Sequence, residues 1–309
     1  MDIDVEIIDL IEEIKNNKTD GASELARQAV KVMKTAAERS QAGNTREFLL
    51  EQKEIGKRLI SARPTMAPIT NIVSRLLSEI IGGVKERNIN KLRQVAISGA
   101  DKLIGDSLEA VRQIAVHGAR LMADGDRIIT NSYSSTVIAM LKKAFSEHKN
   151  IEVIATRSGP GRSGEKTARA LGFDGIPVTL IDDAAVGLYI SAANKVVVGA
   201  DRICADSKVV NGIGTYQLAL VSEKAEVPFY VLCDTFKFDF KLRSDQVDLE
   251  DNEPSEVVET EGLPSEVRVK NPHFDITPLE LVTAVVTENG LLTTRRLLDT
   301  WRETMGQSS

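Results

Sequence analysis

The sequence predicts an α/β protein in which an N-terminal helical domain, residues 1–123, is followed by a domain built on a doubly wound parallel sheet, residues 124–309. Three observations support this fold class. Apolar residues recur with helical spacing up to residue 123. After that point, short β-branched runs alternate with helices of about a dozen residues. Finally, residues 196–201, VVVGAD, are typical of a buried parallel strand that delivers a carboxylate to the carboxyl edge of a sheet.

The first domain is predicted to be a series of amphipathic helices. Apolar side chains spaced by three and four residues define these helices at residues 4–16, 21–42, 45–61, 68–80 and 101–123. Gly43-Asn44 is typical of a helix C-cap, and Pro68 suits the first turn of a helix. Arg63 precedes Pro64, and this interrupts the helical pattern because the residue before a proline disfavours the α conformation.

The second domain is predicted from a change of period at Asp124. Strands are expected at residues 127–130, 151–156, 178–181, 195–199, 229–232 and 282–287, and helices at residues 135–147, 165–171, 184–193, 213–224 and 293–305. Their alternation predicts right-handed βαβ units and a parallel sheet. Residues 207–214 are expected to form a glycine-containing loop, and the acidic residues 245–266 a surface excursion.

Composition excludes several classes of function. Few of the 309 residues are aromatic, 4% against 42% hydrophobic in total, which fits a soluble protein with an aliphatic core. The net charge of −6 argues against a broad nucleic-acid surface. No apolar run reaches the length of a membrane span, and the acidic N-terminus does not resemble a signal peptide, so we predict a cytoplasmic protein without a membrane partner. Cys204 and Cys233 are expected to be buried, reduced thiols, and we predict neither a metal site nor a cofactor.

A hydroxyl-rich turn, residues 130–136 (TNSYSST), follows the first predicted strand and precedes a helix. Backbone N–H groups at a helix N-terminus suit a phosphate or a carboxylate, which makes Asn131 and Ser134 candidate ligand-binding residues. An N-cap formed by Ser134 or Ser135 is an equally simple explanation.

The loop after the second predicted strand, residues 156–164 (TRSGPGRSG), combines glycines with two arginines. Glycines let the backbone approach a ligand closely, and Arg157 and Arg162 suit bidentate binding of an anion. The alternative is a flexible surface loop that carries solvated arginines.

Three further polar residues follow later strands of the predicted sheet. Asp201 and Asn211 come after the fourth strand and Lys237 after the fifth, so Asp201 and Lys237 would form either an acid–base pair or a structural ion pair. The chain contains no phosphate-binding Walker loop, no GxGxxG after the first strand and no GxSxG elbow.

Five blocks of the sequence are, in order, similar to one superfamily: ITNSYSSTV, ATRSGPGRSG, VVVGADRICADSKVVNGIGTYQLAL, DTFKF and NPHFDITPLELV. The superfamily contains the regulatory alpha, beta and delta subunits of translation initiation factor 2B with their archaeal relatives. It also contains the isomerases of methylthioribose 1-phosphate and ribose 1,5-bisphosphate. The resemblance covers nearly the whole chain, including the ARPT segment around Arg63. It implies a helical N-terminal domain, a Rossmann-like C-terminal domain, and assembly as dimers or larger oligomers.

The resemblance implies one of two functions, which differ in a few side chains. The isomerases use a cysteine in a His-Cys turn and the aspartate of Gly-Ala-Asp, and here these positions are Asn131-Ser132 and Asp201. A serine hydroxyl is a far weaker acid than a thiol. Two cations of the isomerase motifs are replaced as well, one by Glu24 and one by Gly212, which weakens attraction for phosphate.

These replacements lead us to predict a non-catalytic subunit, similar to the regulators of initiation factor 2B, which binds the initiation factor 2 complex and senses a phosphorylated sugar or nucleotide. The alternative is an isomerase similar to that of ribose 1,5-bisphosphate, with Asp201 as base and Ser132 in place of the thiol. The predicted partners are further copies of the chain, the alpha subunit of initiation factor 2, and a small phosphorylated ligand. The resemblance implies ligand binding by Arg63, Arg157, Asn211 and Lys237, and the hydroxyl-rich turn adds Asn131 and Ser134 as candidates.

Overall fold

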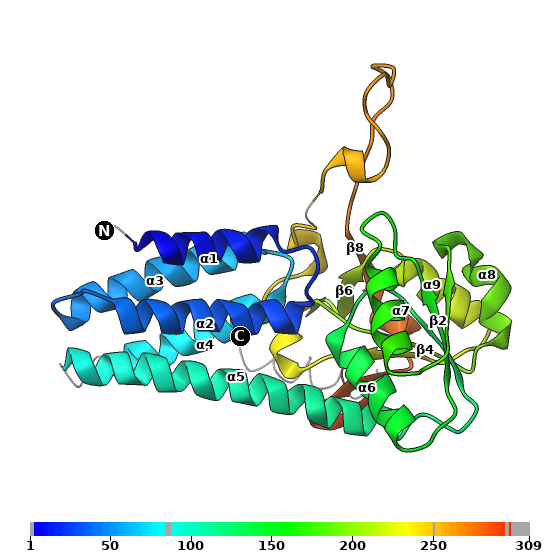
Figure 1. Ribbon diagram of the computed structural model, residues 1–309, viewed down its shortest axis with the longest axis horizontal. Coiled ribbons are helices and arrows are strands. Elements are labelled where there is room, and N and C mark those ends of the chain that lie inside the picture. Colours follow the sequence, from blue (N-terminus) through cyan, green and yellow to red (C-terminus); the bar gives the residue numbers. More distant parts are fainter. Residues whose placement is uncertain (1–2, 84–87, 250, 294–296, 298–309) are drawn as a thin grey trace. The chain divides into compact units, whose positions relative to one another are not determined.

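The computed structural model describes residues 3–83, 88–249, 251–293 and 297 (Figure 1). The chain divides into two compact units, Met1–Glu109 and Ala110–Ser309. The division falls inside helix α5, Ile89–Ala119, and thus earlier than the predicted boundary after residue 123. The reason is that the last turns of α5 contribute Ile114 and Ala119 to the apolar core of the second unit.

The first unit is helical, as the sequence predicts. Its helices are α1 (Val5–Asn16), α2 (Ala22–Arg39), α3 (Thr45–Ala62), α4 (Ala67–Gly83) and the N-terminal part of α5. Helix α5 begins well before the predicted residue 101, because Leu92, Ala96 and Ala100 continue its buried stripe at four-residue spacing. Asn44 caps α3 by accepting a hydrogen bond from the Glu47 N–H at 3.0 Å, so it begins a helix and does not end one.

The second unit contains the sheet and its covering helices. Its strands are β1 (Arg127–Thr130), β2 (Glu152–Thr156), β3 (Val178–Ile181), β4 (Lys195–Val198), β5 (Arg202–Ile203), β6 (Lys208–Gly212), β7 (Phe229–Leu232), β8 (Phe274–Pro278), β9 (Ala284–Thr287) and β10 (Gly290–Thr293). Its longer helices are α6 (Ser135–Ser146), α7 (Ser163–Phe173) and α9 (Thr215–Lys224). The predicted helix at residues 184–193 is broken into three short turns, η2 (Asp183–Ala185), α8 (Val186–Tyr189) and η3 (Ile190–Ala192).

In the part of the chain that the structure describes, the main sheet has the strand order β10-β9-β7-β4-β1-β2-β3. Its neighbouring strands run parallel except for β10, which pairs antiparallel with β9. The order of strands along the chain reverses at β1, between β2 on one side and β4 on the other. Loops that follow adjacent parallel strands at such a point diverge and leave room for a ligand.

Both faces of the main sheet are covered by helices, because successive residues of each strand point to opposite sides. Ile128 and Val197 pack with helices α6 and α7 on one face. Ile129, Val196 and Val198 pack with α8 and α9 on the other. The central strands are therefore apolar without alternation, which is the pattern expected of a buried parallel sheet.

The structure also contains a second, antiparallel sheet with the order β5-β6-β8, which was not predicted from the sequence. Residues 207–214, predicted to be a loop, contain β6, in which Asn211 pairs with Asp275 of β8. The prediction was wrong at this point because the partner strand lies more than 60 residues further along the chain, and pairing at that separation leaves no local sequence signal.

The acidic excursion forms an extended arm on the second unit, drawn in orange near η6 (Pro254–Glu256) in Figure 1. The predicted helix at residues 293–305 lies almost entirely outside the described residues. Among the helices that the structure describes, none combines the length and the apolar character that crossing a membrane requires.

Candidate functional site

Three chain segments meet closely at the carboxyl edge of the main sheet, and two glycines make the approach possible. A Cβ atom on Gly199, after β4, would lie 2.7 Å from the Oγ of Ser134, and one on Gly212, at the end of β6, would lie 2.7 Å from the Oγ of Ser132. The loop after β1 therefore packs against the ends of both β4 and β6. No other residue could occupy either glycine position without displacing a serine of the candidate site.

The amide of Asn131 joins the segments from within. It is buried, and its Nδ2 donates to the carbonyl oxygens of Gly212 and Ile213 at 3.2 and 3.1 Å and to Thr215 Oγ1 at 3.2 Å. Its Oδ1 accepts from Thr156 Oγ1 at 2.7 Å and from Ser158 Oγ at 3.0 Å. Both ends of the amide are thus engaged by the protein, so Asn131 organises the site.

Two serines at this edge have left-handed backbone conformations. Ser132 has a φ of 66° and Ser158 a φ of 58°, values that non-glycine residues adopt rarely. The Ser132 N–H donates to Ser158 Oγ at 2.7 Å, and the Ser132 and Ser163 hydroxyls lie 3.0 Å apart. Asp183 holds the second turn, because its carboxylate accepts from the N–H groups of Ser158 and Gly159, each at 2.7 Å. Such strain is sustained where the surroundings fix it, most often at functional sites.

Two predicted ligand-binding residues already have simple structural contacts. Ser134 is the N-cap of α6 and accepts from the Val137 N–H at 3.3 Å. Arg157 forms an ion pair with Glu165 at 3.3 Å and is partly exposed. Ser134 therefore has the capping role that the sequence offered as an alternative, whereas Arg157 is held by an ion pair and is not a solvated arginine; a ligand-binding role for either residue stays a prediction.

Asp201 ends the turn from β4 to β5, and Asn211 lies in β6, the strand that pairs with β5. The Asp201 N–H donates to the Val210 carbonyl oxygen at 2.9 Å, which fixes the turn to β6. Asn211 is buried, its Nδ2 donates to Thr215 Oγ1 at 2.9 Å, and its Oδ1 lies near the position that a Cβ of Gly199 would take. Their backbone positions place Asp201 and Asn211 at the same edge as Ser132.

Lys237 ends the short helix η4 (Thr235–Lys237), directly after β7. Its side chain is buried, with 4% of the residue exposed. Over the residues that the structure describes, its ammonium group takes part in no hydrogen bond or ion pair. Because the residue is largely removed from water and its cation has no anionic partner among these residues, this arrangement suits the binding of an anion.

Asp275 of β8 holds the start of α9. Its Oδ2 accepts from the N–H groups of Gly214 and Tyr216 at 2.8 and 3.0 Å, while its Oδ1 is buried without a hydrogen-bond partner. Burial raises the pKa of the Asp275 carboxyl to about 6, against the lowering effect of these N–H groups. Asp275 thereby fixes the turn to which Asn131 and Asn211 both bind.

The two cysteines cannot replace the thiol that is missing at position 132. Both are free and buried, as predicted. Burial raises the pKa of the Cys204 thiol to about 12 and raises the pKa of Cys233 as well. Neither thiol can therefore ionise near neutral pH.

Arg63 belongs to the first unit. It is buried, and its Nη1 donates to the Asn17 carbonyl oxygen at 2.6 Å.

Three residues that position the site escaped the sequence prediction: Ser158, Asp183 and Asp275. Asp183 had a detectable signal, since Asp182-Asp183 directly follows the strand β3 at the sheet edge. The other two depend on contacts across 25 or more residues, and nothing in the local pattern marks them.

Residues 18–294 match the Initiation factor 2 subunit family. The chain belongs to this family. It is 38% identical over 282 residues to the ribose 1,5-bisphosphate isomerase of Methanocaldococcus jannaschii, covering 91% of this chain and 89% of the relative. It is also 36% identical to a putative translation initiation factor eIF-2B subunit 2-like protein of Pyrococcus furiosus, over 93% of this chain and 96% of that one.

Among solved structures, the fold is similar to that of translation initiation factor eIF-2B from Pyrococcus horikoshii OT3. The TM-score is 0.81 at 32% identity, and the match covers 93% of this chain and 97% of the other. The mixed fold, with a helical N-terminal region and a mostly parallel sheet, is thereby confirmed.

The prediction of a non-catalytic regulatory subunit was wrong. Several archaeal relatives, at 31–38% identity over most of the chain, bear the name ribose 1,5-bisphosphate isomerase. The prediction gave the loss of one thiol more weight than the retention of Asp201, although a carboxylate can by itself both take and return a proton. Contact with the alpha subunit of initiation factor 2 was predicted as part of that role, and it stays a prediction.

Proposed function

We propose that this protein is a sugar-phosphate aldose–ketose isomerase that acts on ribose 1,5-bisphosphate. The observation that carries the proposal is the 38% identity, over about nine-tenths of both chains, to an isomerase named for this substrate. Lys237, a cationic residue that is 4% exposed, supports an anionic substrate independently of any relative.

The reaction moves hydrogen between neighbouring carbons of the sugar. The bond from C1 to the ring oxygen breaks and that oxygen gains a proton, hydrogen moves from C2 to C1, and the C2 hydroxyl loses its proton to become a ketone. No atom enters or leaves. The protein must therefore supply a group that accepts and returns a proton, together with fixed donors for the phosphates and the developing carbonyl.

We assign the proton-transfer role to Asp201 and a hydrogen-bonding role to the Ser132 hydroxyl. The amide of Asn211 would bind a sugar oxygen, and the ammonium of Lys237 a phosphate, because a buried ammonium interacts with phosphate in a weakly screened environment. Ser134, Arg157 and Asn131 complete the proposed ligand-binding set of this unit; Asn131 acts through the turns that its amide holds. The ligand-binding role of Arg63, which the resemblance implies, stays a prediction.

We further propose that the sheet unit is Rossmann-like and that the protein assembles as a homo-oligomer. The strand order 3-2-1-4 at one side of the sheet, followed by β7 and β9, supports the first point. Exposed apolar side chains on neighbouring helices, Leu188 of α8 and Leu220 of α9, support the second. Light scattering on the purified protein measures the oligomer, and a monomeric mass would contradict it.

The deciding experiment incubates the purified protein with ribose 1,5-bisphosphate and follows the formation of the ketose bisphosphate. We expect turnover by the natural protein and its loss in Asp201→Asn. A parallel assay with methylthioribose 1-phosphate tests the second substrate, for which an isomerase of similar structure is named. Absence of ketose from ribose 1,5-bisphosphate would overturn the proposal.

A further inference from the structure

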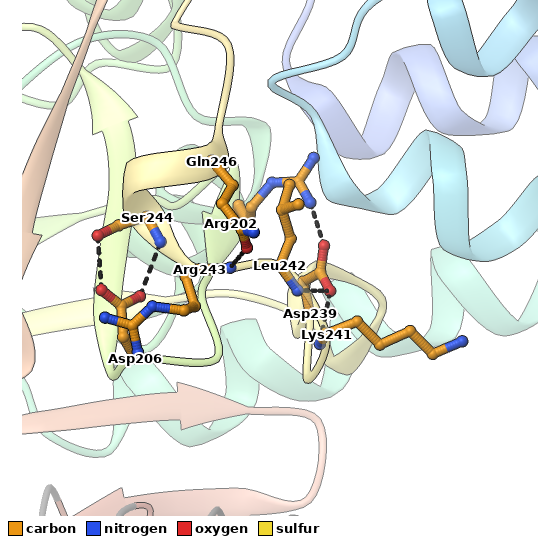
Figure 2. Close-up of polar contacts among 8 residues, drawn as sticks. All are labelled: Arg202, Asp206, Asp239, Lys241, Leu242, Arg243, Ser244 and Gln246. Atoms are coloured by element: carbon orange, nitrogen blue, oxygen red, sulfur yellow. Dashed lines mark hydrogen bonds and ion pairs between the residues drawn. The ribbon is translucent and has the colours of Figure 1, made fainter.

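A buried ion pair lies beside both the proposed acid and the proposed cation of the site. Arg202 directly follows Asp201 and begins β5, and its Nη1 donates to the Oδ2 of Asp239, two residues after Lys237 (Figure 2). Only 3% of the Arg202 side chain and 15% of the Asp239 side chain are exposed. The pair therefore joins the turn that carries Asp201 to the turn that carries Lys237.

The Asp239 carboxylate uses its second oxygen to hold its own turn. Its Oδ1 accepts from the N–H groups of Lys241 and Leu242, each at 3.0 Å. Such a carboxylate–backbone arrangement closes a tight turn, so the side chain that meets Arg202 is itself fixed. A rigid acceptor opposite a planar guanidinium restricts the relative position of the two chain segments.

Other contacts hold the rest of this segment, residues 238–246, in place. The Asp239 N–H donates to the Ile203 carbonyl oxygen at 2.8 Å, and the Ala205 N–H donates to the Leu242 carbonyl oxygen at 2.9 Å. Ser244 donates from its N–H and its hydroxyl to Asp206 at 2.8 and 2.6 Å, as Figure 2 shows. These contacts do not involve the Arg202 side chain, so the segment stays docked when the ion pair is removed.

We propose that the Arg202–Asp239 ion pair is a positioning pair, which fixes the Asp201 turn relative to the Lys237 turn and thereby sets the rate of isomerisation. Neither residue touches the substrate. The proposal rests on the proposed function, since Asp201 and Lys237 are the proton-transfer and phosphate-binding groups assigned above. A buried ion pair is weak evidence for stability alone, because its desolvation cost offsets much of the attraction.

The chain supplies a matched control at the other end of the strand that precedes Arg202. Lys195 begins β4 and forms an ion pair with Asp126 at 2.6 Å, with side-chain exposures of 16% and 7%. Arg202→Met and Lys195→Met each remove the cation of a mostly buried pair near one end of β4. Only the first pair lies next to the proposed site.

The experiment measures kcat and KM for ribose 1,5-bisphosphate, together with the melting temperature, in both variants. We expect Arg202→Met to lower kcat about 10- to 100-fold, the loss typical of a misplaced catalytic group, and Lys195→Met to change kcat less than about twofold. Arg202→Lys should recover part of the lost kcat. Asp239→Asn, which keeps an acceptor for the two backbone N–H groups, should lower kcat even where Arg202→Met fails to fold.

A double variant separates the effect of the ion pair on the position of the catalytic groups from its effect on the stability of the protein. Replacing both charges of a buried ion pair often preserves stability, so Arg202→Met/Asp239→Asn, in which the amide oxygen still accepts from the Lys241 and Leu242 N–H groups, should regain the melting temperature and not the kcat. Equal losses of kcat in Arg202→Met and Lys195→Met would overturn the proposal, and so would a double variant with the natural kcat.

Measuring the binding of ribose 1,5-bisphosphate by calorimetry allows the positioning pair and the proposed function to be tested separately. If the natural protein binds the compound without producing ketose, the isomerase proposal fails. The positioning pair is then judged by affinity: binding weakened at least tenfold in Arg202→Met but not in Lys195→Met supports it, and equal affinities overturn it. A natural protein that neither binds nor converts the compound contradicts both proposals.

Discussion

The two edges of the main sheet differ in one buried cation and in local backbone strain. At the edge where the strands begin, Lys195 pairs with Asp126 at 2.6 Å, and Arg127 pairs with Glu152 at 2.9 Å. At the edge where the strands end, Arg157 and Arg202 are also paired, but Lys237 has no ion pair among the described residues, and two serines lie in left-handed conformations. The first edge is arranged for stability. The second retains a cation without an ion pair among the described residues, with which a bound phosphate would pair. Functional sites often keep such locally unfavourable arrangements at a cost in stability.

The largest expected effect comes from the proposed acid. Asp201→Asn should lower kcat on the order of 10²–10⁴-fold, the usual contribution of a general acid–base residue. The matched variant at the opposite edge, Asp126→Asn, should lower the melting temperature and leave kcat within about threefold. Steady-state assays with ribose 1,5-bisphosphate measure kcat in both variants. Comparable kcat losses in the two variants would contradict the assignment of the site to one edge.

The pH dependence of stability should differ in sign at the two edges. Burial raises the pKa of Asp275 to about 6, so the folded state binds a proton more tightly than the unfolded state, whose carboxyl has its usual pKa of 3.8. Between these values the contribution of Asp275 to the free energy of unfolding falls as the pH rises, by up to about 3 kcal/mol.

Urea unfolding at pH 4.5 and pH 7.5 tests this sign. The free energy of unfolding of Asp275→Asn, minus that of the natural protein, should be larger at pH 7.5 than at pH 4.5. At the other edge, hydrogen bonds from the backbone and side chain of Asn150 lower the pKa of Asp124, so its contribution is present above the unfolded pKa and is lost on acidification. A difference for Asp275→Asn that does not change with pH would contradict the assignment.

Lys237→Met should change binding and stability in opposite directions. Loss of a charged hydrogen bond to phosphate is expected to weaken ribose 1,5-bisphosphate binding by about 1.5–3 kcal/mol. Removal of an ammonium that has no ion pair among the described residues, on a residue that is 4% exposed, should raise the free energy of unfolding of the ligand-free protein by about 1–2 kcal/mol. Lys195→Met, which breaks a pair, should lower it. Calorimetry and urea unfolding give the two values, and a Lys237→Met protein that is less stable than the natural one would show that the ammonium is already satisfied.

The smallest effect is expected at the serine that replaces the thiol. Ser132→Ala removes one neutral hydrogen bond, worth about 0.5–1.5 kcal/mol, and should therefore lower kcat no more than about tenfold. Ser146→Ala, which removes an exposed hydroxyl bonded to the Lys143 carbonyl oxygen, is the matched control and should leave kcat unchanged. A loss as large as that of Asp201→Asn would mean that the Ser132 hydroxyl itself transfers a proton.

Local sequence was sufficient for most of the fold. The helical stripes of α2, α3 and α4 and the β-branched runs of β1, β4 and β7 depend on residues close together in the chain, and their periods predict the elements and the parallel order of the sheet. The same patterns placed Asp201, Ser132 and Lys237 beyond strand ends that share one edge. Long-range pairing was not predictable: β6 was expected to be a loop because its partner β8 is remote.

The sequence by itself determined which residues stand at the ends of the strands, because strand periodicity and strand order are local properties. The tertiary structure alone decided what those residues do. Asn131 is saturated by protein contacts, Arg157 is paired with Glu165, and Lys237 is buried without an ion pair among the described residues. These differences arise from burial and from partners distant in sequence, such as Asp239 for Arg202. Neither can be predicted from the spacing of residues along the chain.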